Sequence, residues 1–277
     1  MALGLIYITN IPAVALIAEK YGVEQVMVDL ETLGKEERQK GMNTVQSHHS
    51  IEDIATISNM LTKAEMLVRV NPWNENSACE IESVIASGAD RIMLPMWKSA
   101  KEVNSFLKAV NKRVRTTLLL ETKEAVACLD EVLANPMIDE IHIGLNDLHL
   151  SYGLTFMFEL LSNGIVETIC EKCKVHNVPY GFGGIAKIGE GTLPAERIVM
   201  EHYRLGSTKV ILSRSFCNTD EICDLAEIQT IFAINIEKLR SYEASLSSKT
   251  KEDYIENKQA VAECVNMIVC KIKENQR

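Results

Sequence analysis

Two carboxylates, Glu121 and Asp147, each follow an apolar stretch of the chain, Thr117–Leu120 and Ile141–Leu145 respectively. Such stretches are typical of buried strands in a parallel sheet. A carboxylate where such a strand stops lies at the carboxyl end of the sheet, where α/β proteins bind their ligands. Two acids on neighbouring strands can share one hard cation. The spacing therefore predicts a site for Mg²⁺, or another divalent cation such as Mn²⁺, on Glu121 and Asp147.

Further charged and polar residues fall at the ends of other predicted strands. Asp29 and Glu31 end one strand, and residues two apart in a strand point to the same side. Arg69 lies near the end of the next predicted strand, and Ser213 and Arg214 lie in the last one. Several buried acids are costly in free energy unless a cation pairs with them. We expect a divalent metal and Arg69 to supply that pairing.

Arg69 beside a metal site favours a substrate that carries a carboxylate, because guanidinium binds carboxylate through two parallel hydrogen bonds. A 2-oxo acid would chelate the metal through its carboxylate and keto oxygens. The metal would then polarise the ketone and stabilise an enolate. This is the chemistry of adding pyruvate to an aldehyde, or of the reverse cleavage.

Strand and helix patterns alternate along the chain, and this alternation must position the charged residues. The predicted strands cover about 4–10, 25–31, 65–71, 91–96, 117–121, 141–146, 178–184 and 209–216. Eight strand–helix units in strict alternation predict a (βα)₈ TIM barrel, an α/β fold. An open doubly wound sheet is the alternative. The lack of a Gly-x-Gly-x-x-Gly turn after the first strand counts against a dinucleotide-binding fold.

The segment after the eighth strand is predicted to be helical. We expect residues 1–217 to form the catalytic barrel and residues 218–277 a helical extension, with helices over about 219–245 and 251–274. Apolar residues recur at helical spacing from Tyr254 to Ile272. Such a stripe must be buried against another surface, either the same barrel or a neighbouring subunit. We therefore expect a homo-oligomer.

Composition excludes several classes of function. The formal net charge of −9 and the pI of about 5.3 give no sign of nucleic-acid binding. No apolar run reaches the ~20 residues that a membrane span needs. The eight cysteines are irregularly spaced and the first residues lack a signal peptide, so we expect reduced thiols in the cytoplasm. Cys170 and Cys173 lie in one helical pattern and are expected to pack in it.

Five segments occur in the order and spacing of a known family: Val28–Glu31, Val68–Pro72, Met93–Pro95, Leu120–Ala125 and Ile143–Leu148. With these motifs, residues 4–217 resemble the HpcH/HpaI aldolase and citrate lyase β-subunit family of metal-dependent, class II pyruvate aldolases. The resemblance implies a (βα)₈ barrel and oligomers that pack a C-terminal helix on a neighbour.

The resemblance also implies roles for individual residues. Glu121 and Asp147 would bind Mg²⁺, and Arg69 would hold the substrate carboxylate or the enolate. Asp29 and Glu31 would order water around the metal. Leu145 and Asn146, which precede Asp147 in the same motif, would contact the substrate.

Three positions depart from the family pattern. Thr32 stands where the aldolase branch has a catalytic histidine and the lyase branch a third acid. Leu119 replaces a glutamine that contacts the keto acid, and Ala86 replaces an aspartate used across a subunit boundary. The metal platform is thus retained, while the positions that choose the substrate and move protons are changed.

Several histidines are candidates for the missing base. His48 and His49 lie on the loop after the second strand, at the active face, where an imidazole can exchange protons. His149 is a weaker candidate. His142 is expected to be a hydrogen-bonded core residue, and His202 to lie on a helix surface.

A glycine-rich loop follows the seventh strand and contains Gly183 and Gly184. Loops after strands seven and eight bind phosphate in many barrels. Lys187, Ser213 and Arg214 are therefore expected to complete a substrate-binding anion site with these glycines, and a flexible lid is the alternative.

The sequence thus predicts a metal-dependent carbon–carbon lyase of the aldolase type. Its substrates would be a pyruvate-like 2-oxo acid and an aldehyde. Two alternatives remain: a citrate-lyase-like enzyme that cleaves an acyl-CoA thioester, and a barrel that binds a metabolite without turnover.

Overall fold

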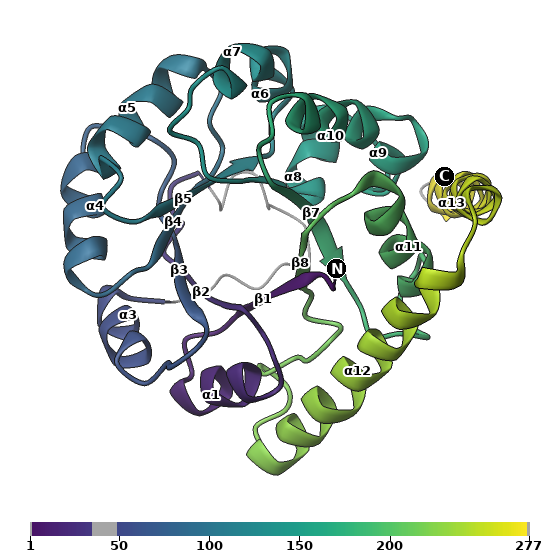
Figure 1. Ribbon diagram of the computed structural model, residues 1–277, viewed down its shortest axis with the longest axis horizontal. Helices are drawn as coiled ribbons and strands as arrows, with labels where there is room; N and C mark the ends of the chain where they lie inside the picture. Colours follow the sequence, from purple (N-terminus) through teal and green to yellow (C-terminus); the bar gives the residue numbers. More distant parts are fainter. Residues whose placement is uncertain (1, 35–48, 276–277) are drawn as a thin grey trace.

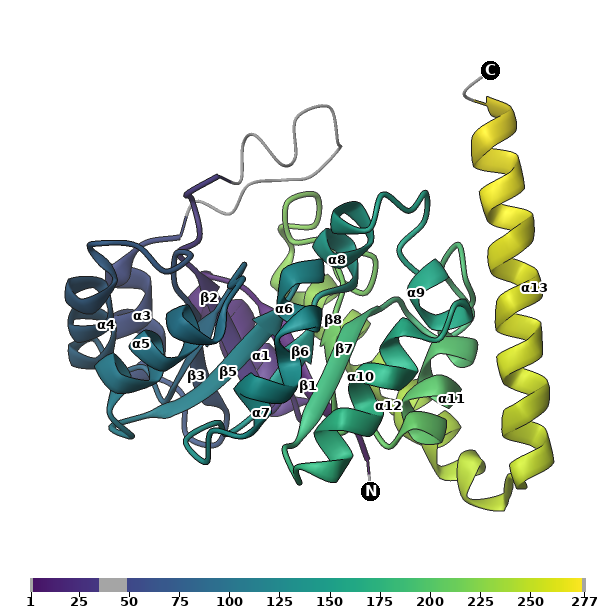
Figure 2. The same ribbon diagram turned by 90° about the horizontal axis from the view of Figure 1, so that it is seen from above.

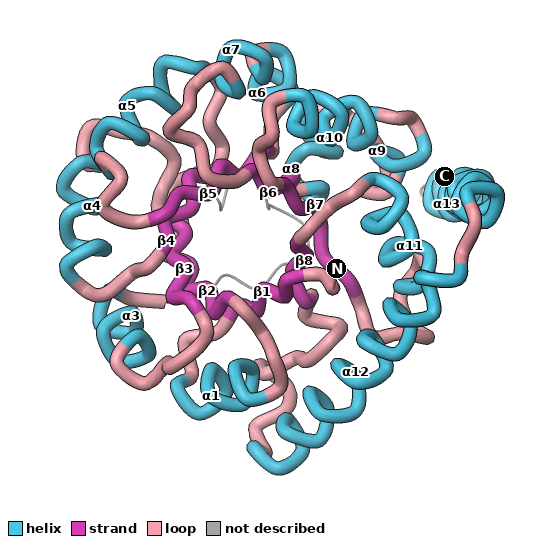
Figure 3. The backbone as a smooth tube through the Cα atoms, viewed as in Figure 1, coloured by secondary structure: helices cyan, strands magenta, loops and turns pink. Residues whose placement is uncertain are grey.

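The computed structural model describes residues 2–34 and 49–275 of the 277-residue chain. Eight parallel strands close into a barrel in the order β1 to β8, and helices surround it (Figures 1 and 3). The predicted (βα)₈ barrel with additional C-terminal helices is confirmed, and the open doubly wound sheet is wrong. None of the helices in the described ranges is both long and apolar enough to cross a membrane.

The strands are short, as expected for a barrel of this class. Their bounds are β1 Gly4–Ile8, β2 Gln25–Asp29, β3 Glu65–Arg69, β4 Arg91–Leu94, β5 Arg115–Leu120, β6 Ile141–Ile143, β7 Tyr180–Ile185 and β8 Lys209–Leu212. The helices are α1 Pro12–Lys20, α3 Ile51–Ser58, α4 Ser77–Ala86, α5 Ala100–Val110, α6 Lys123–Ala127, α7 Leu129–Leu133, α8 Leu145–Ser151, α9 Glu159–Ser162, α10 Ile165–Val175, α11 Ala195–Leu205, α12 Leu225–Ser245 and α13 Lys251–Asn275.

Two helix boundaries illustrate how the sequence sets the elements. Ser50 precedes α3, and its backbone N–H donates to the Asp53 carboxylate at 2.7 Å, a capping interaction that the sequence predicts. Helix α11 begins directly after Pro194 and ends at Leu205, and the following Gly206 has a φ of 73° that suits glycine.

Several predicted elements are shorter or divided. Strand β6 ends at Ile143, and the short helix α8 follows at once, so Asp147 lies in the first turn of a helix. The segment 122–134 is divided into helices α6 and α7, and the segment 155–176 into helices α9 and α10. Strand β8 ends at Leu212, four residues earlier than predicted.

The barrel interior is apolar in its middle layer and charged below it. Ile6, Met27, Leu67, Met93 and Leu119 form the apolar layer, one residue from each of the first five strands. Towards the amino ends of the strands, the interior is filled by a polar network of Gln25, Glu65, Arg91, Glu140 and Lys209. The remaining inner strand residues, which follow the apolar layer, are those that reach the mouth of the barrel.

The last two helices have different roles. Helix α12 packs against α1, so it closes the outer ring between α11 and the first helix. Helix α13 lies against α9 and α11 on the flank of its own barrel, and its last turns extend past α9 (Figure 2). Asn257, which is buried, bonds to Glu201 at 2.9 Å and to Arg197, so polar contacts fix how α13 docks. Its apolar stripe of Val261, Val265 and Val269 is buried on this barrel.

Candidate active site

Arg69, at the carboxyl end of β3, is held rigidly by two acids at the carboxyl end of β2. Asp29 and Arg69 are directly opposite in the paired strands, and the arginine Nε and Nη2 each donate to the Asp29 carboxylate at 2.8 Å. Its Nη1 lies 3.4 Å from Glu31. Burial alone would lower the pKa of Arg69, but the neighbouring carboxylates of Asp29, Glu31 and Glu121 raise it above its ordinary value. The guanidinium is therefore a fixed positive charge in the mouth.

Glu121 follows β5 directly, and only 4% of its surface is exposed. The backbone N–H of Met96 points towards Glu121 Oε2 at 3.4 Å, and Met96 has a φ of 55°, which is unusual outside glycine. A Cβ on Gly144 would lie 2.6 Å from Glu121 Cγ, so the position of this carboxylate requires glycine after β6. Asp147 follows three residues after Gly144, in α8.

Glu121 and Asp147 therefore come from adjacent units of the barrel, at the same end of paired strands. Among residues 2–34 and 49–275, no group of three or more His, Cys, Asp or Glu side chains is placed to hold a metal. Mg²⁺ is commonly bound through one or two carboxylates and keeps water and substrate oxygens as its other ligands. Two hard carboxylate donors, one of them packed directly against Gly144, are of the type that binds Mg²⁺ or Mn²⁺.

The residues after β2 are tied to the end of β3 by Asn71. Its side-chain oxygen accepts from the backbone N–H groups of Thr32 and Leu33 at 2.9 and 3.0 Å. Its amide nitrogen donates to Glu80 at 2.8 Å. Asn71 thereby fixes the chain that carries Glu31, a role that the sequence alone did not reveal.

His49 lies beside the same acids. Its Nδ1 accepts a hydrogen bond from the backbone N–H of Asp29 at 2.9 Å, so the proton of the neutral ring is on Nε2. His48, the other predicted base, lies outside the described residues.

We call Asp29, Glu31, Arg69, Glu121 and Asp147 the charged side of the mouth.

The opposite side of the mouth is formed by β7, β8 and β1. Gly183 and Gly184 of β7 are partly exposed there and carry no side chain. Inward-facing Ile8 of β1 and Ile211 of β8 are also partly exposed. We call these four residues the open side.

Comparison with known proteins identifies the framework of this site. A family model described as HpcH/HpaI aldolase/citrate lyase matches residues 3–177. The chain belongs to this family. Membership supports a lyase, and the match ends just before β7, so the charged side lies within it while three of the four open-side residues lie beyond it.

Solved structures of the family share the fold. An HpcH/HpaI aldolase from Desulfitobacterium hafniense DCB-2 superposes with a TM-score of 0.63 at 14% identity, over 86% of this chain and 93% of that chain. An HpcH/HpaI aldolase/citrate lyase family protein from Burkholderia cenocepacia J2315 gives 0.59 at 15% identity, over 82% and 95% respectively. No curated protein matches the sequence significantly.

The other residues predicted to bind substrate are dispersed. Leu145 is buried and would touch a Cβ on Gly183 at 2.7 Å, whereas Asn146 is exposed. The Ser213 hydroxyl donates to the Ile185 carbonyl at 2.8 Å and is thus directed at β7. Arg214 is exposed and lines a shallow pocket of about 410 Å³, shared with Lys187 and its ion-pair partner Glu190. The structure therefore brings Lys187 and Arg214 together, with acids among them.

Of the predictions made for two further histidines, the one for His142 is confirmed and the one for His202 is wrong. His142 is buried in β6, where its Nε2 pairs with the Gly183 carbonyl at 3.1 Å, as expected of a core histidine. Burial lowers the pKa of His142 to about 4. The prediction for His202 is wrong, because this residue is fully buried, stacks on Phe182 at 3.7 Å and bonds to Ser207. Burial also lowers its pKa well below the ordinary value.

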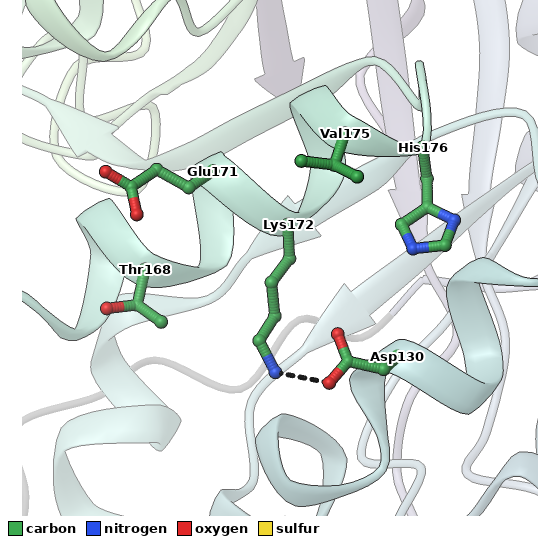
Figure 4. A pocket seen from close by; sticks show the side chains of 6 residues that line it. All are labelled: Asp130, Thr168, Glu171, Lys172, Val175 and His176. Carbon is green, nitrogen blue, oxygen red and sulfur yellow. Dashed lines mark hydrogen bonds and ion pairs between the residues drawn. The ribbon is translucent and has the colours of Figure 1, made fainter.

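A second shallow pocket, on the helical outside, is remote from the mouth. It lies between α7 and α10 and contains the Lys172–Asp130 ion pair at 2.8 Å (Figure 4). Cys170 and Cys173 are buried on the same helix, and burial raises the pKa of Cys173 to about 12. Their predicted packing role is confirmed, since a buried, protonated thiol is a poor nucleophile.

The sequence offered a signal for some of the missed residues. Gly144, between an apolar run and Asp147, can be recognised in the sequence as a position without a side chain, and in the structure the Glu121 side chain packs there. The left-handed backbone of Met96 and the bonds of Asn71 depend on contacts across strands, so their roles emerge only in the folded chain.

Proposed function

We propose that this protein is a metal-dependent carbon–carbon lyase of the aldolase type. It would form or cleave the bond between the enolate of a pyruvate-like 2-oxo acid and an aldehyde. The proposal rests on one observation: the rigid Asp29–Arg69 pair lies at the same barrel end as Glu121, whose charge acts on Arg69.

In this mechanism Glu121 and Asp147 would hold the divalent cation, Mg²⁺ or Mn²⁺. When bound, the cation supplies Lewis acidity that polarises the ketone of the substrate. Arg69 donates hydrogen bonds to the substrate carboxylate or to the enolate oxygen as negative charge develops. Because Asp29 occupies the Nε and Nη2 edge and Glu31 lies 3.4 Å from Nη1, the guanidinium would offer the substrate the remaining N–H groups of Nη1 and Nη2.

Asp29 and Glu31 have a positioning role in this proposal. They fix the plane of the guanidinium, and a group held before reaction costs no reorganisation during it. Leu145, Gly183 and Gly184 would shape the substrate cavity. Asn146, Ser213 and Arg214 are proposed contacts for the more distant end of the substrate.

We assign the transfer of the substrate proton to a histidine of the loop after β2 or to water. His49 accepts the Asp29 N–H through Nδ1 and carries its ring proton on Nε2, so it would have to release the Asp29 N–H before Nδ1 could take up a proton. His48 is the second candidate. Thr32 is unsuited to this role because an aliphatic hydroxyl does not titrate near neutral pH.

The proposal is tested by proton exchange. The protein is incubated with pyruvate and Mg²⁺ in D₂O, and the methyl signal of pyruvate is followed by NMR. We expect metal-dependent loss of the signal, and we expect Glu121→Ala to abolish it.

Two other outcomes have distinct meanings. Activity confined to acyl-CoA thioesters would assign the barrel to citrate-lyase-like cleavage. Binding of 2-oxo acids without exchange would instead identify a metabolite-binding barrel, a reading favoured by the apolar Leu119 in the interior layer.

A further inference from the structure

Strand β7 is irregular at the point where it reaches the mouth of the barrel. Its register against β8 shifts between Gly181 and Gly184, where β7 contains one residue more than β8. Such an irregularity disrupts the ladder of hydrogen bonds between the strands. Gly183 lies within this interval and has a φ of 56°, a left-handed backbone that favours glycine. This stretch of β7 therefore depends on contacts other than the ladder bonds.

His142 provides one such contact from inside the barrel. It is opposite Leu119 in the pairing of β5 with β6, so its ring points into the interior as that leucine does. Its Nε2 lies 3.1 Å from the carbonyl oxygen of Gly183. A carbonyl can only accept a hydrogen bond, so the proton of the neutral ring is on Nε2. The imidazole thus donates directly to the irregular part of β7.

The second ring nitrogen of His142 has no room for a proton. Nδ1 is buried and has no hydrogen-bond partner among the residues that the structure describes. It faces Gly181, where a Cβ would lie only 2.9 Å away. A proton on Nδ1 would create a buried charge and a buried donor without an acceptor. Charging the ring therefore requires it to leave this site, and its bond to Gly183 is then lost.

A second buried histidine lies on the outer face of the same strand. His202 of α11 stacks on Phe182, with ring centroids 3.7 Å apart and an angle of 3° between the rings. Its Nδ1 lies 2.8 Å from Ser207 Oγ, while its Nε2 is buried without a partner in the described part of the chain. Both histidines are fully buried, and burial favours the neutral ring. Residues 181–183 of β7 therefore lie between two neutral imidazoles.

The charges around the two rings do not offset this cost of burial. Within the described ranges, Glu140 and Lys209 act on His142, and these two oppose each other as an ion pair. The titratable group that acts on His202 is His142 itself, on the other face of β7. A charge on one ring therefore disfavours a charge on the other while the strand stays in place. Both rings gain protons readily only when β7 releases them.

We propose that His142 and His202 form a pH-sensitive latch on β7. While both rings are neutral, the latch holds the β7 wall of the mouth, Gly183 and Gly184, in place, and uptake of protons by the rings releases this wall. A Cβ on Gly183 would lie 2.7 Å from Leu145, so release also loosens the contact between β7 and α8. The latch does not depend on the proposed lyase reaction, because it concerns the wall of the mouth alone.

Proton linkage sets the size of the effect. A released histidine has an ordinary pKa of about 6.5, whereas the rings in the closed strand stay neutral down to pH 5.5. Each ring therefore makes opening of β7 about tenfold more favourable at pH 5.5 than at pH 7.5. The two rings together give about 100-fold. The closed strand is thus most stable above pH 6.5, and its stability falls as the pH decreases.

The test is amide hydrogen exchange of the full-length protein, followed by mass spectrometry at pH 7.5 and pH 5.5. Peptides that cover β7 are compared with peptides that cover β3, on the charged side, after correction for the intrinsic effect of pH. Urea well below the unfolding midpoint separates local opening, which is insensitive to it, from global unfolding. Wild-type β7 should exchange about 100-fold faster at pH 5.5 than at pH 7.5, ahead of β3 and independently of urea.

Two variants show which ring carries the response. His142→Gln removes one of the two titrating rings, so an acceleration of only about tenfold should remain. His176→Gln is the matched control, because His176 is exposed directly after α10. It should keep the full acceleration of β7.

Three results overturn the latch. Exchange of β7 and β3 at equal rates, with equal dependence on urea, would show that only global unfolding responds to pH. A corrected β7 rate that is the same at both pH values would show that neither ring acts on the strand. An acceleration that stays at about 100-fold in His142→Gln would exclude that ring. The first two comparisons use wild-type protein alone, so they decide the matter even when His142→Gln does not fold.

Discussion

The charged side and the open side of the mouth differ in how their residues are held. On the charged side, Arg69 makes two hydrogen bonds to Asp29 and lies near Glu31, while Asn71 fixes the adjoining chain. On the open side, the two glycines and two isoleucines have no polar side-chain atoms that need hydrogen-bond partners. A buried charge without partners is costly, whereas an apolar wall tolerates changes of shape more readily.

The boundary between the two sides coincides with the end of the segment that the family model matches. The match to residues 3–177 includes all of the charged side and stops before β7. Ile8 is the one open-side residue inside it. The difference suggests that the reaction and the choice of substrate are carried by separable parts of one barrel, which makes the contrast testable by paired substitutions.

The largest effect is expected from Arg69→Lys. A lysine is a point charge and cannot make two parallel bonds to Asp29 while facing the substrate. We expect the rate of metal-dependent exchange to fall about 100-fold. Arg113→Lys is the matched control, because Arg113 forms a similar two-bond pair with Glu82 on the surface. An equal loss in both variants, measured by NMR, would show that Arg69 has no special role.

Gly144→Ala should weaken metal binding rather than the reaction alone. The new Cβ would lie 2.6 Å from Glu121 Cγ and displace that carboxylate. We expect the affinity for Mn²⁺ to fall about 10- to 100-fold by calorimetry. Gly184→Ala on the open side meets only ordinary contacts of 3.4 and 3.6 Å, so its Mn²⁺ affinity should stay near wild type. A similar loss of Mn²⁺ affinity in the two variants would contradict the proposed difference between the charged side and the open side.

The stability of the β6–β7 seam should depend on pH. His142 has a pKa of about 4 in the folded protein and an ordinary one of about 6.5 when unfolded, so the unfolded state binds more protons between these values. Stability is therefore lost as the pH falls below 6.5. For His142 alone the loss is about 1.4 kcal/mol at pH 5.5.

Comparison of variants isolates this contribution. His142→Gln should reduce the fall in the free energy of unfolding between pH 7 and 5.5, measured by denaturant titration, while the part due to buried His202 remains. The exposed His176→Gln should leave the fall unchanged. Parallel curves for His142→Gln and wild type would contradict the assignment of a buried neutral histidine.

The smallest effect is expected from Asn71→Ala. Its loss removes the acceptor of the Thr32 and Leu33 N–H groups, which orders the chain next to Glu31. We expect kcat/KM for exchange to fall about fivefold, the size of one net hydrogen bond. Asn163→Ala, on a surface turn, is the control. A wild-type rate in Asn71→Ala would show that Glu31 is held without this contact.

Much of the fold followed from local pattern. Alternating apolar runs and capped helices predicted eight strand–helix units, because each run needs burial on both faces. Glu121 and Asp147 were found for the same reason, as acids at the ends of buried runs. Helix α8 was missed because Leu145–Ser151 is short and directly continues the apolar run of β6.

Contacts between distant segments were beyond such reasoning. His202 lies in a helix with polar neighbours, yet it stacks on Phe182 of β7, twenty residues earlier. The bonds of Asn71 to the chain after β2, and the approach of Met96 to Glu121, likewise depend on neighbouring strands. Local spacing does not encode these pairings.

Metal binding by the charged side is the central claim, and Mn²⁺ binding followed by electron paramagnetic resonance tests it most directly. Wild-type protein should bind one Mn²⁺ per chain. Glu121→Gln should weaken that binding at least about tenfold. Glu124→Gln, an exposed neighbour in α6, should bind as wild type does. Equal Mn²⁺ affinity in Glu121→Gln and wild type would contradict the account.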